Sequence, residues 1–222
     1  MTGVQTCALP ICHPKHTRIA LNIGGIANIT VIPPRGDVIA FDTGPGNMAI
    51  DALAHEHTKS KRNYDRGGRI AGSGRVDREL LDRLLRDPYY RRRPPKSVGR
   101  EQYGAEFIES LKQSGLSMPD LIATATVLTA ATIARGIRLC DVAYGDLIVS
   151  GGGTHNPRIM AHLAAFLPEF AISTSTDHGI DADAKEAIAF AILAHETWRR
   201  KPSNLPAATG ARRSVVLGSI TP

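Results

Sequence analysis

Cysteine, aromatic side chains and long apolar runs are all scarce in this chain of 222 residues. Its three cysteines, Cys7, Cys12 and Cys140, are an odd number and lack the paired spacing of a zinc site. They argue against a disulfide framework and fit a reducing cytoplasm. The most apolar stretch, residues 121–134, is interrupted by threonines and is shorter than the roughly 20 residues that a membrane span needs. We therefore expect no membrane partner.

A large excess of charge of one sign is also missing. The chain has 27 Lys and Arg against 21 Asp and Glu, a net charge of +6, and much of the excess lies in the run RRRPPK at residues 91–96. Apart from Tyr89 and Tyr90, no aromatic residues are interleaved with this run, as they would be in a nucleic-acid surface. We interpret it as a solvated loop and expect no nucleic-acid partner. The composition, 42% hydrophobic and 22% charged, is that of a globular domain.

The first twelve residues, MTGVQTCALPIC, differ from the rest of the chain. They have neither the basic start of a signal peptide nor the period of a helix or strand. They resemble a translated sequencing-adaptor tract. That interpretation makes residues 1–12 a non-native tail and places the start of the natural protein upstream of about His13. A short disordered natural terminus is the alternative.

The order of the expected elements begins with three strands. Short apolar runs predict strands at 18–23, 26–32 and 38–41, and the short connections between them require antiparallel pairing. The remaining expected elements are a helix from the N-cap Asn47, helices near 77–86 and 104–114 within a polar insertion at about 59–117, a helix at about 119–139, a strand at 147–149, a helix capped by Asn156 and Pro157, a strand at 170–172, a helix at 183–198 and a short strand at 214–217. In the helix at 183–198, one face carries the apolar residues Ala187, Phe190, Ala191 and Ala194.

This order predicts the fold class. Three antiparallel strands followed by helical crossovers to further strands make an α/β fold with a mixed five-stranded sheet and helices on both faces. It is the ribonuclease H-like order found in each lobe of actin-like ATPases. Order alone does not fix function, because unrelated functions share such folds.

Two glycine-rich turns near the start of the chain carry functional signal. At Gly24-Gly25 the backbone can approach an anion closely, or simply make a tight turn, and the flanking Asn22 and Asn28 favour a binding site. The sequence FDTGPGN at 41–47 joins a strand end to a helix start. Free N–H groups there, together with the Asp42 carboxylate, suit sugar hydroxyls or metal-bound water, although an ordinary capped turn has similar residues.

A third turn, SGGGTHNP at 150–157, places glycines between a strand and a helix, which is the general arrangement for cradling nucleotide phosphates. It lacks the Gly-Lys-Ser/Thr of a Walker A loop. It is close to a dinucleotide fingerprint, with Asn156 in place of the third glycine and Asp177 where an acidic ribose ligand would stand. Half of a nicotinamide-dependent dehydrogenase is therefore an alternative, although the antiparallel start of the chain argues against it.

Several motifs in order resemble the anhydro-N-acetylmuramic acid kinases of bacteria. The main ones are NIGGIAN at 22–28 and FDTGPGNM at 41–48. The others are PKSVGRE at 95–101, SGGG at 150–153 with NP at 156–157, DAKEA at 183–187, NLP at 204–206 and TGA at 209–211. The resemblance covers about residues 13–222. Val98 is a departure, because the family usually has Thr there.

The resemblance implies an actin-like, cytoplasmic, typically dimeric enzyme of peptidoglycan recycling. Such an enzyme uses ATP and Mg²⁺ to open the 1,6-anhydro ring of anhydro-N-acetylmuramic acid with water and to phosphorylate O6. The residues that it places at the nucleotide are Gly24, Gly25, Asn28, Gly151, Gly152, Gly153 and Asn156. The residues that it places at the sugar or metal are Asp42, Gly44, Asn47 and Glu186, although capping of a helix start is an alternative role for Glu186.

The resemblance also implies that part of the active site lies elsewhere. Ring opening needs a general base to activate water. In the family this base is an aspartate upstream of the first strand, and the first phosphate loop lies further upstream, in the other lobe. We expect the chain to be the C-terminal lobe of such a kinase and inactive alone. A nucleotide-binding module without catalysis is the non-enzymatic alternative.

Overall fold

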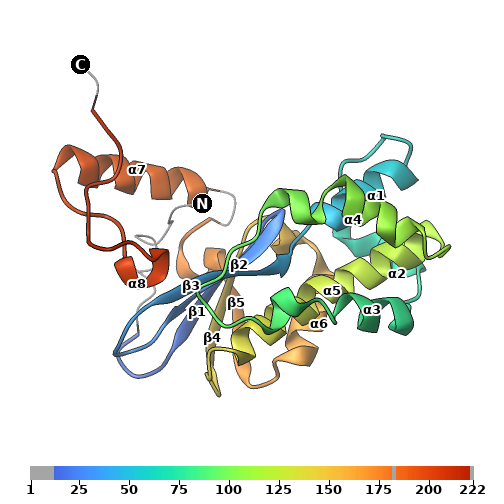
Figure 1. Ribbon diagram of the computed structural model, residues 1–222, viewed down its shortest axis with the longest axis horizontal. Coiled ribbons are helices and arrows are strands. Elements are labelled where there is room, and N and C mark those ends of the chain that lie inside the picture. Colours follow the sequence, from blue (N-terminus) through green and yellow to red (C-terminus); the bar gives the residue numbers. More distant parts are fainter. Residues whose placement is uncertain (1–12, 182–183, 221–222) are drawn as a thin grey trace.

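The computed structural model describes residues 13–181 and 184–220, with only the backbone of Glu186 (Figure 1). Its strands are β1 (Arg18–Ile23), β2 (Ile26–Ile32), β3 (Ile39–Pro45), β4 (Gly145–Ser150) and β5 (Phe170–Thr174). Its α-helices are α1 (Met48–His57), α2 (Arg69–Ser73), α3 (Arg78–Leu84), α4 (Ala105–Lys112), α5 (Met118–Arg138), α6 (Pro157–Phe166), α7 (Lys185–Trp198) and α8 (Pro206–Thr209). The predicted order of strands and long helices is confirmed.

The five strands form one mixed sheet in the order β3-β2-β1-β4-β5. The pairs β1–β2 and β2–β3 are antiparallel, whereas β1–β4 and β4–β5 are parallel. This is the ribonuclease H-like arrangement that the sequence predicts. The antiparallel half is incompatible with the doubly wound parallel sheet that the dehydrogenase alternative requires.

The main core lies between one face of the sheet and α5. Ile19, Leu21 and Ile23 alternate along β1 with less buried residues and join α5 in one apolar cluster. The Ser117 side chain accepts a hydrogen bond from the N–H of Asp120, and this cap fixes the start of α5. By length and composition α5 could cross a bilayer, but 83% of its most apolar window is buried inside the protein, as expected of a core helix.

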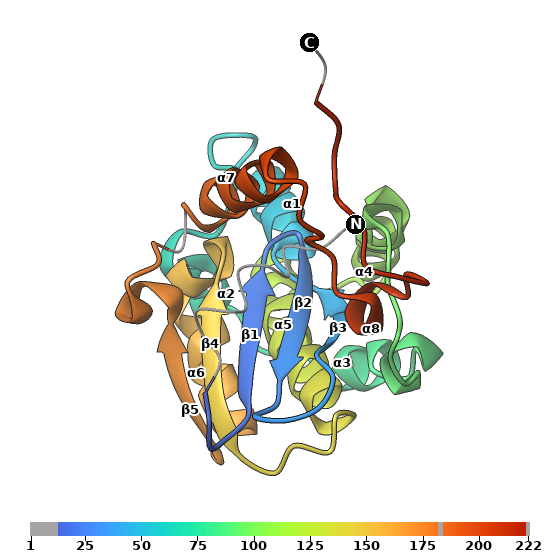
Figure 2. The ribbon, with the colours of Figure 1, turned by 90° about the vertical axis from the view of Figure 1, so that its left-hand side faces the viewer.

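Helices lie on both sides of the sheet, as predicted. Figures 1 and 2 show α5 and α6 behind one face and α7 and α8 on the opposite side, with α8 next to β3. The helices of residues 59–117 lie on the same side of the sheet as α5, because α2 and α3 contact α5. Ile70, Leu80 and Leu111 from this segment belong to the main apolar cluster.

Two expected strands differ from the structure. β3 continues to Pro45, because a bulge at Ala27 and Asn28 lets β2 pair with the segment predicted to break the chain. The predicted strand at 214–217 is wrong. The N–H of Val215 donates to the side chain of Asn204, and its carbonyl accepts from Ser203, so this segment has one backbone bond instead of a ladder.

The apolar face of α7 lies on the surface. Ala187, Phe190, Ala191 and Ala194 are all exposed, and Phe190 is 66% exposed. Trp198, at the end of the same stripe, is 74% exposed. The helix instead turns Ala189 into the protein, where it is fully buried. Within the described residues, α7 therefore presents an unpaired apolar stripe to solvent.

Candidate nucleotide and sugar site

The three glycine-rich turns meet at one edge of the sheet. β1, β3 and β4 run in the same direction, so their carboxyl ends lie at the same edge (Figure 2). Each of these ends leads into one of the three turns. The sheet topology therefore brings together segments that are more than a hundred residues apart in the sequence.

The second turn is docked on the first by backbone hydrogen bonds. The N–H of Gly46 donates to the Gly25 carbonyl over 3.0 Å, and the N–H of Asn47 donates to the Gly24 carbonyl over 2.7 Å. The N–H of Met48 also donates to Gly25, over 3.3 Å. The expectation of free N–H groups at the start of α1 is therefore wrong for these three. Asn47 precedes α1, but its side chain makes no capping bond.

Other N–H groups at this edge are available to a ligand. Among the described residues, no hydrogen bond engages the N–H groups of Gly24, Gly25 or Gly152. Gly152 begins the 3₁₀ turn η5 (Gly152–His155) that follows β4. Groups of this kind at the start of a helical turn and in a glycine hairpin are suited to anionic oxygens.

The third turn is packed tightly against the end of β1. Gly151 has φ +85°, a conformation that favours glycine, and a Cβ there would lie 2.8 Å from the Ile23 carbonyl oxygen. A Cβ at Gly153 would lie 2.3 Å from Ile23 Cγ2 and 3.3 Å from Asn47 Oδ1. The side chain of Asn47, the last residue of the second turn, therefore lies next to the third turn, and the three turns form one cluster.

A row of polar residues crosses the sheet beside these turns. The register pairs Asp42 with Asn28, Asn28 with Asn22, and Asn22 with Ser150. Paired residues share one face of a sheet, and here it is the face opposite α5, because Leu21 and Ile23 point into the core. Lys185, from the first turn of α7, donates from Nζ to Asn22 Oδ1 and to Ser150 Oγ, each over 2.7 Å.

Asp42 is the half-buried carboxylate of this row. Its Oδ2 accepts the N–H of Val98 over 3.0 Å, and its carbonyl accepts the hydroxyl of Tyr89 over 2.7 Å. Burial raises the pKa of the Asp42 carboxyl above its usual range, and the bond from Val98 opposes this increase in part. No hydrogen bond from a described residue reaches Oδ1, so this oxygen is free to accept a proton or to bind a ligand.

Three other predicted residues lie less directly at the cluster. A Cβ at Gly44 would lie 3.0 Å from Thr132 of α5 and from Tyr90, so close packing alone explains this glycine. The Asn156 side chain caps α6 by accepting the N–H of Arg158, which confirms the expected cap. The side chain of Glu186 and the adjoining Asp183 lie outside the described residues.

The sequence did not single out Lys185. It appears there only as part of the DAKEA motif at 183–187, although the structure places its ammonium between the ends of β1 and β4. Asn22 is 163 residues away from Lys185, so no local pattern reveals the contact. The only local signal is a lysine in the first turn of a helix, where the dipole disfavours a cation.

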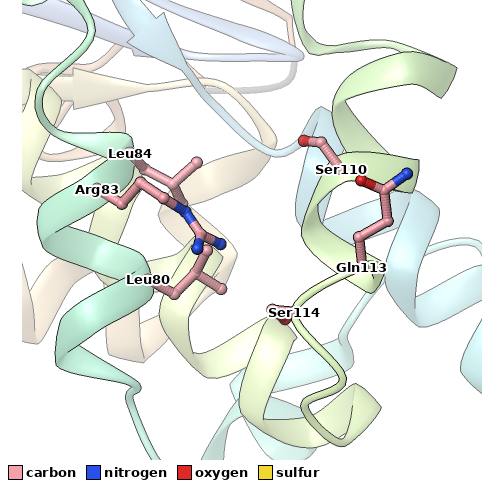
Figure 3. Close-up of a pocket in the computed structure, with 6 residues that line it drawn as sticks. All are labelled: Leu80, Arg83, Leu84, Ser110, Gln113 and Ser114. Carbon is pink, nitrogen blue, oxygen red and sulfur yellow. The ribbon is translucent and has the colours of Figure 1, made fainter.

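A separate hollow of about 400 Å³ lies between α3 and α4 (Figure 3). Its lining residues are Leu80, Arg83, Leu84, Ser110, Gln113 and Ser114. The hydroxyls of Ser110 and Ser114 donate to carbonyls of their own helix region, to Phe107 and Leu111. Over the described residues, no group of three His, Cys, Asp or Glu side chains is placed to hold a metal ion.

Comparisons with known proteins agree with these motifs. A model of the family described as anhydro-N-acetylmuramic acid kinase matches residues 6–222, a range that includes part of the segment interpreted as a non-native tail. A protein of that name from Caldanaerobacter subterraneus subsp. tengcongensis is 42% identical over 218 residues, covering 94% of this chain and 55% of the relative. Another, from Photobacterium profundum, is 45% identical over 215 residues, covering 93% and 56%.

The chain thus spans a little over half the length of these relatives. Among solved structures, it is similar to an activator of 2-hydroxyisocaproyl-CoA dehydratase from Clostridium difficile with bound ADPNP. That likeness has 13% identity and a TM-score of 0.49, and covers 84% of this chain and 61% of the other. The family match extends over nearly the whole chain and includes all three glycine-rich turns. The chain belongs to the anhydro-N-acetylmuramic acid kinase family.

Proposed function

We propose that this chain supplies the nucleotide-binding and part of the sugar-binding surface of a kinase acting on anhydro-N-acetylmuramic acid. The reaction consumes ATP and water, opens the 1,6-anhydro ring and yields N-acetylmuramate 6-phosphate. The observation that carries this proposal is the convergence of three glycine-rich turns and a polar row at one edge of the sheet. Family membership makes phosphoryl transfer the corresponding chemistry.

The nucleotide would lie along the first and third turns. Phosphoryl transfer depends on positioning and on neutralising the phosphate charges. The free N–H groups of Gly24, Gly25 and Gly152 supply donors, and the absence of side chains there permits close approach. Gly151 and Gly153 act indirectly in this scheme, because they hold the third turn against β1.

The sugar and Mg²⁺ would lie toward Asp42 and Asn47. Mg²⁺ is bound in kinases through one or two carboxylates, waters and substrate phosphates, so a single free carboxylate oxygen fits its requirements. When bound, the ion would neutralise charge on the transferred phosphoryl group. Asp42 Oδ1 would hold the ion through a water molecule or accept a substrate hydroxyl.

Asp42 is also a candidate for the general base of ring opening. A carboxyl whose pKa is raised by burial accepts a proton more readily at neutral pH than an ordinary aspartate. In this role Oδ1 takes a proton from the attacking water, whose oxygen bonds to the anomeric carbon as the bond from that carbon to O6 breaks. The released O6 takes the terminal phosphoryl group of ATP, and ADP leaves. The aspartate upstream of β1, which the resemblance implies, is the competing candidate.

We further propose that the chain is inactive alone and works in the cytoplasm as part of a longer homodimeric protein. The family's first phosphate loop would come from the other lobe, and Figure 2 shows the edge with the turns beside α7. The exposed stripe of α7 supports a contact with another surface. Sedimentation of the full-length protein as a monomer would contradict the dimer.

A coupled assay of ADP release tests the function. The purified chain and the protein extended by its upstream genomic sequence are each incubated with ATP, Mg²⁺ and the anhydro-sugar. We expect turnover only in the extended protein, with N-acetylmuramate 6-phosphate as product. Turnover by the chain alone would contradict its inactivity. Nucleotide binding without turnover in the extended protein would favour the non-catalytic binding module.

A further inference from the structure

The segment of residues 89–98 lies along the outer side of β3 at Asp42. β3 is an edge strand, because the sheet order begins with it. The N–H of Asp42 donates to the Lys96 carbonyl over 3.3 Å, and the Asp42 carbonyl accepts the Tyr89 hydroxyl over 2.7 Å. Asp42 Oδ2 accepts the N–H of Val98 over 3.0 Å. This segment therefore fixes the main chain of Asp42 and one of its two carboxylate oxygens.

Lys96 contacts both Tyr89 and the strand that carries Asp42. Its side chain is buried, and its Nζ donates to the Tyr89 carbonyl over 3.0 Å. The ammonium lies 4.6 Å from the centroid of the Tyr89 ring and 5.5 Å from that of the Phe41 ring, close enough for attraction between a cation and an aromatic face. Phe41 precedes Asp42 in β3. Lys96 therefore holds the ring whose hydroxyl bonds to Asp42.

The burial of the Lys96 ammonium has a cost in stability. Burial and, next, the charge of Arg92 lower the pKa of Lys96. Among the residues that the structure describes, no carboxylate forms an ion pair with it. An apolar side chain of similar volume would fill the same space without this cost. The contacts of the ammonium therefore point to a role beyond packing.

We propose that Tyr89 and Lys96 are positioning residues of the ring-opening reaction: Tyr89 holds the main chain of Asp42, and Lys96 holds Tyr89. A base takes a proton efficiently only from a fixed position within hydrogen-bond reach of it, and these contacts give Asp42 Oδ1 one orientation. This inference rests on the proposed function, because it takes Asp42 as the base. Neither residue needs to contact the substrate.

A purely structural role for the two side chains is the competing explanation. In that case their hydrogen bonds attach residues 89–98 to β3 and do nothing else. Removing them would then lower the free energy of unfolding and leave the kcat of the folded protein unchanged. A positioning role affects kcat instead, and only while residue 42 keeps its carboxylate.

Steady-state assays of the extended protein distinguish the two explanations. We expect Tyr89→Phe to lower kcat by about tenfold with KM for ATP unchanged, because the ring stays and only the bond to Asp42 is lost. Tyr103→Phe is the matched control. It removes a hydroxyl from the same apolar cluster, but this hydroxyl donates to Tyr90 and not to Asp42, so kcat should be unchanged. Equal losses in the two variants would overturn the inference.

A double-mutant cycle tests whether Tyr89 acts through Asp42. In the Asp42→Asn background, Tyr89→Phe should cause no further loss of kcat, because the group that Tyr89 positions is no longer a base. Losses that multiply in the double variant would overturn the inference, since Tyr89 would then act independently of the carboxylate.

Lys96→Met separates activity from stability. The Tyr89 carbonyl keeps a second bond, from the N–H of Arg92 over 3.2 Å, so this variant leaves no buried carbonyl unpaired. We expect urea denaturation of the whole chain to show unchanged or higher stability, because a buried charge is removed. In the extended protein, kcat should fall severalfold. Lower stability with unchanged kcat would show that Lys96 is structural and overturn its part in the inference.

The outcomes also separate this inference from the function on which it rests. Unchanged kcat in Asp42→Asn overturns Asp42 as the base and the positioning roles together. Unchanged kcat in Tyr89→Phe, with Asp42→Asn impaired, overturns the positioning role alone. A loss in Tyr89→Phe that disappears in the Asp42→Asn background, with Tyr103→Phe unaffected, supports both.

Discussion

The backbone N–H of Asn47 donates to the carbonyl oxygen of Gly24 over 2.7 Å, so helix α1 starts directly on the hairpin between β1 and β2. Gly46, the residue before Asn47, is fixed by two hydrogen bonds. Its N–H donates to Gly25 over 3.0 Å, and its carbonyl accepts the hydroxyl of Thr129 in α5 over 2.9 Å. The position of the first turn, and of its free N–H groups, therefore depends on the second turn.

Gly46→Ala should destabilise the protein and disturb the first turn. A Cβ at Gly46 would lie 2.1 Å from the Gly24 carbonyl oxygen, so the backbone has to move. We expect the free energy of unfolding to fall by about 1–3 kcal/mol, as in overpacked cores. Urea denaturation measures this change. Gly24→Ala is the control for stability, because its nearest contact would be an ordinary 3.5 Å. Equal stability of the two variants would contradict the close packing of Gly46 against the Gly24 carbonyl.

Asp42→Asn tests the carboxylate of the polar row in the extended, active protein. We expect kcat to fall by about 10²–10⁴-fold if Asp42 takes the proton from water, as for loss of a general base. The fold should persist, because an amide oxygen can still accept the N–H of Val98. Steady-state assays measure the effect, with the exposed Asp37→Asn as control. An unchanged kcat would leave the upstream aspartate as the base.

Asp51 should make stability depend on pH. Burial and, next, the negative charge of Asp65 raise the pKa of Asp51 to about 7, far above its value in an unfolded chain. The folded protein therefore holds a proton that the unfolded chain releases. The stabilisation is complete in acid below the unfolded pKa and is lost as the pH rises to about 7.

Thermal melts of Asp51→Asn across this range check the prediction. The amide stays neutral at every pH, so the variant should be more stable than the unsubstituted chain at pH 8 and similar to it near pH 4. Asp82→Asn, at an exposed position of α3, should leave the pH dependence unchanged. If the melting temperature of the variant equals that of the unsubstituted chain at every pH, the raised pKa of Asp51 is contradicted.

The apolar stripe of α7 should promote association of the chain with itself. Phe190→Ser and Trp198→Ser should reduce the associated fraction in sedimentation velocity, because they remove exposed apolar surface. Neither should change the free energy of unfolding by more than about 0.5 kcal/mol, since both side chains are mainly exposed. Ala189→Ser, on the buried side of α7, is the contrasting variant and should lower stability. Loss of stability in the two stripe variants would show that this face is buried in solution.

Local sequence patterns predicted those helices and strands that depend on residues close together in the chain. β1 and β2 coincide with their expected ranges, because alternating apolar residues and the Gly24-Gly25 turn specify a hairpin. The cap at Asn156 was also predictable from its neighbour Pro157. The end of β3 was not predictable. Gly44 and Pro45 usually end a strand, but here they pair with β2 beyond a bulge. The segment 214–217 has apolar residues of a strand but forms no ladder in the described part of the chain.

The sequence by itself determined the order of elements and the glycine motifs, and with them the family. These features depend on residues close together in the chain. Only the tertiary structure decided which backbone donors are free, because the carbonyls of Gly24 and Gly25 take up the N–H groups at the start of α1. It also brought Lys185 to Asn22, since parallel pairing of β1 with β4 places their ends side by side beneath the first turn of α7.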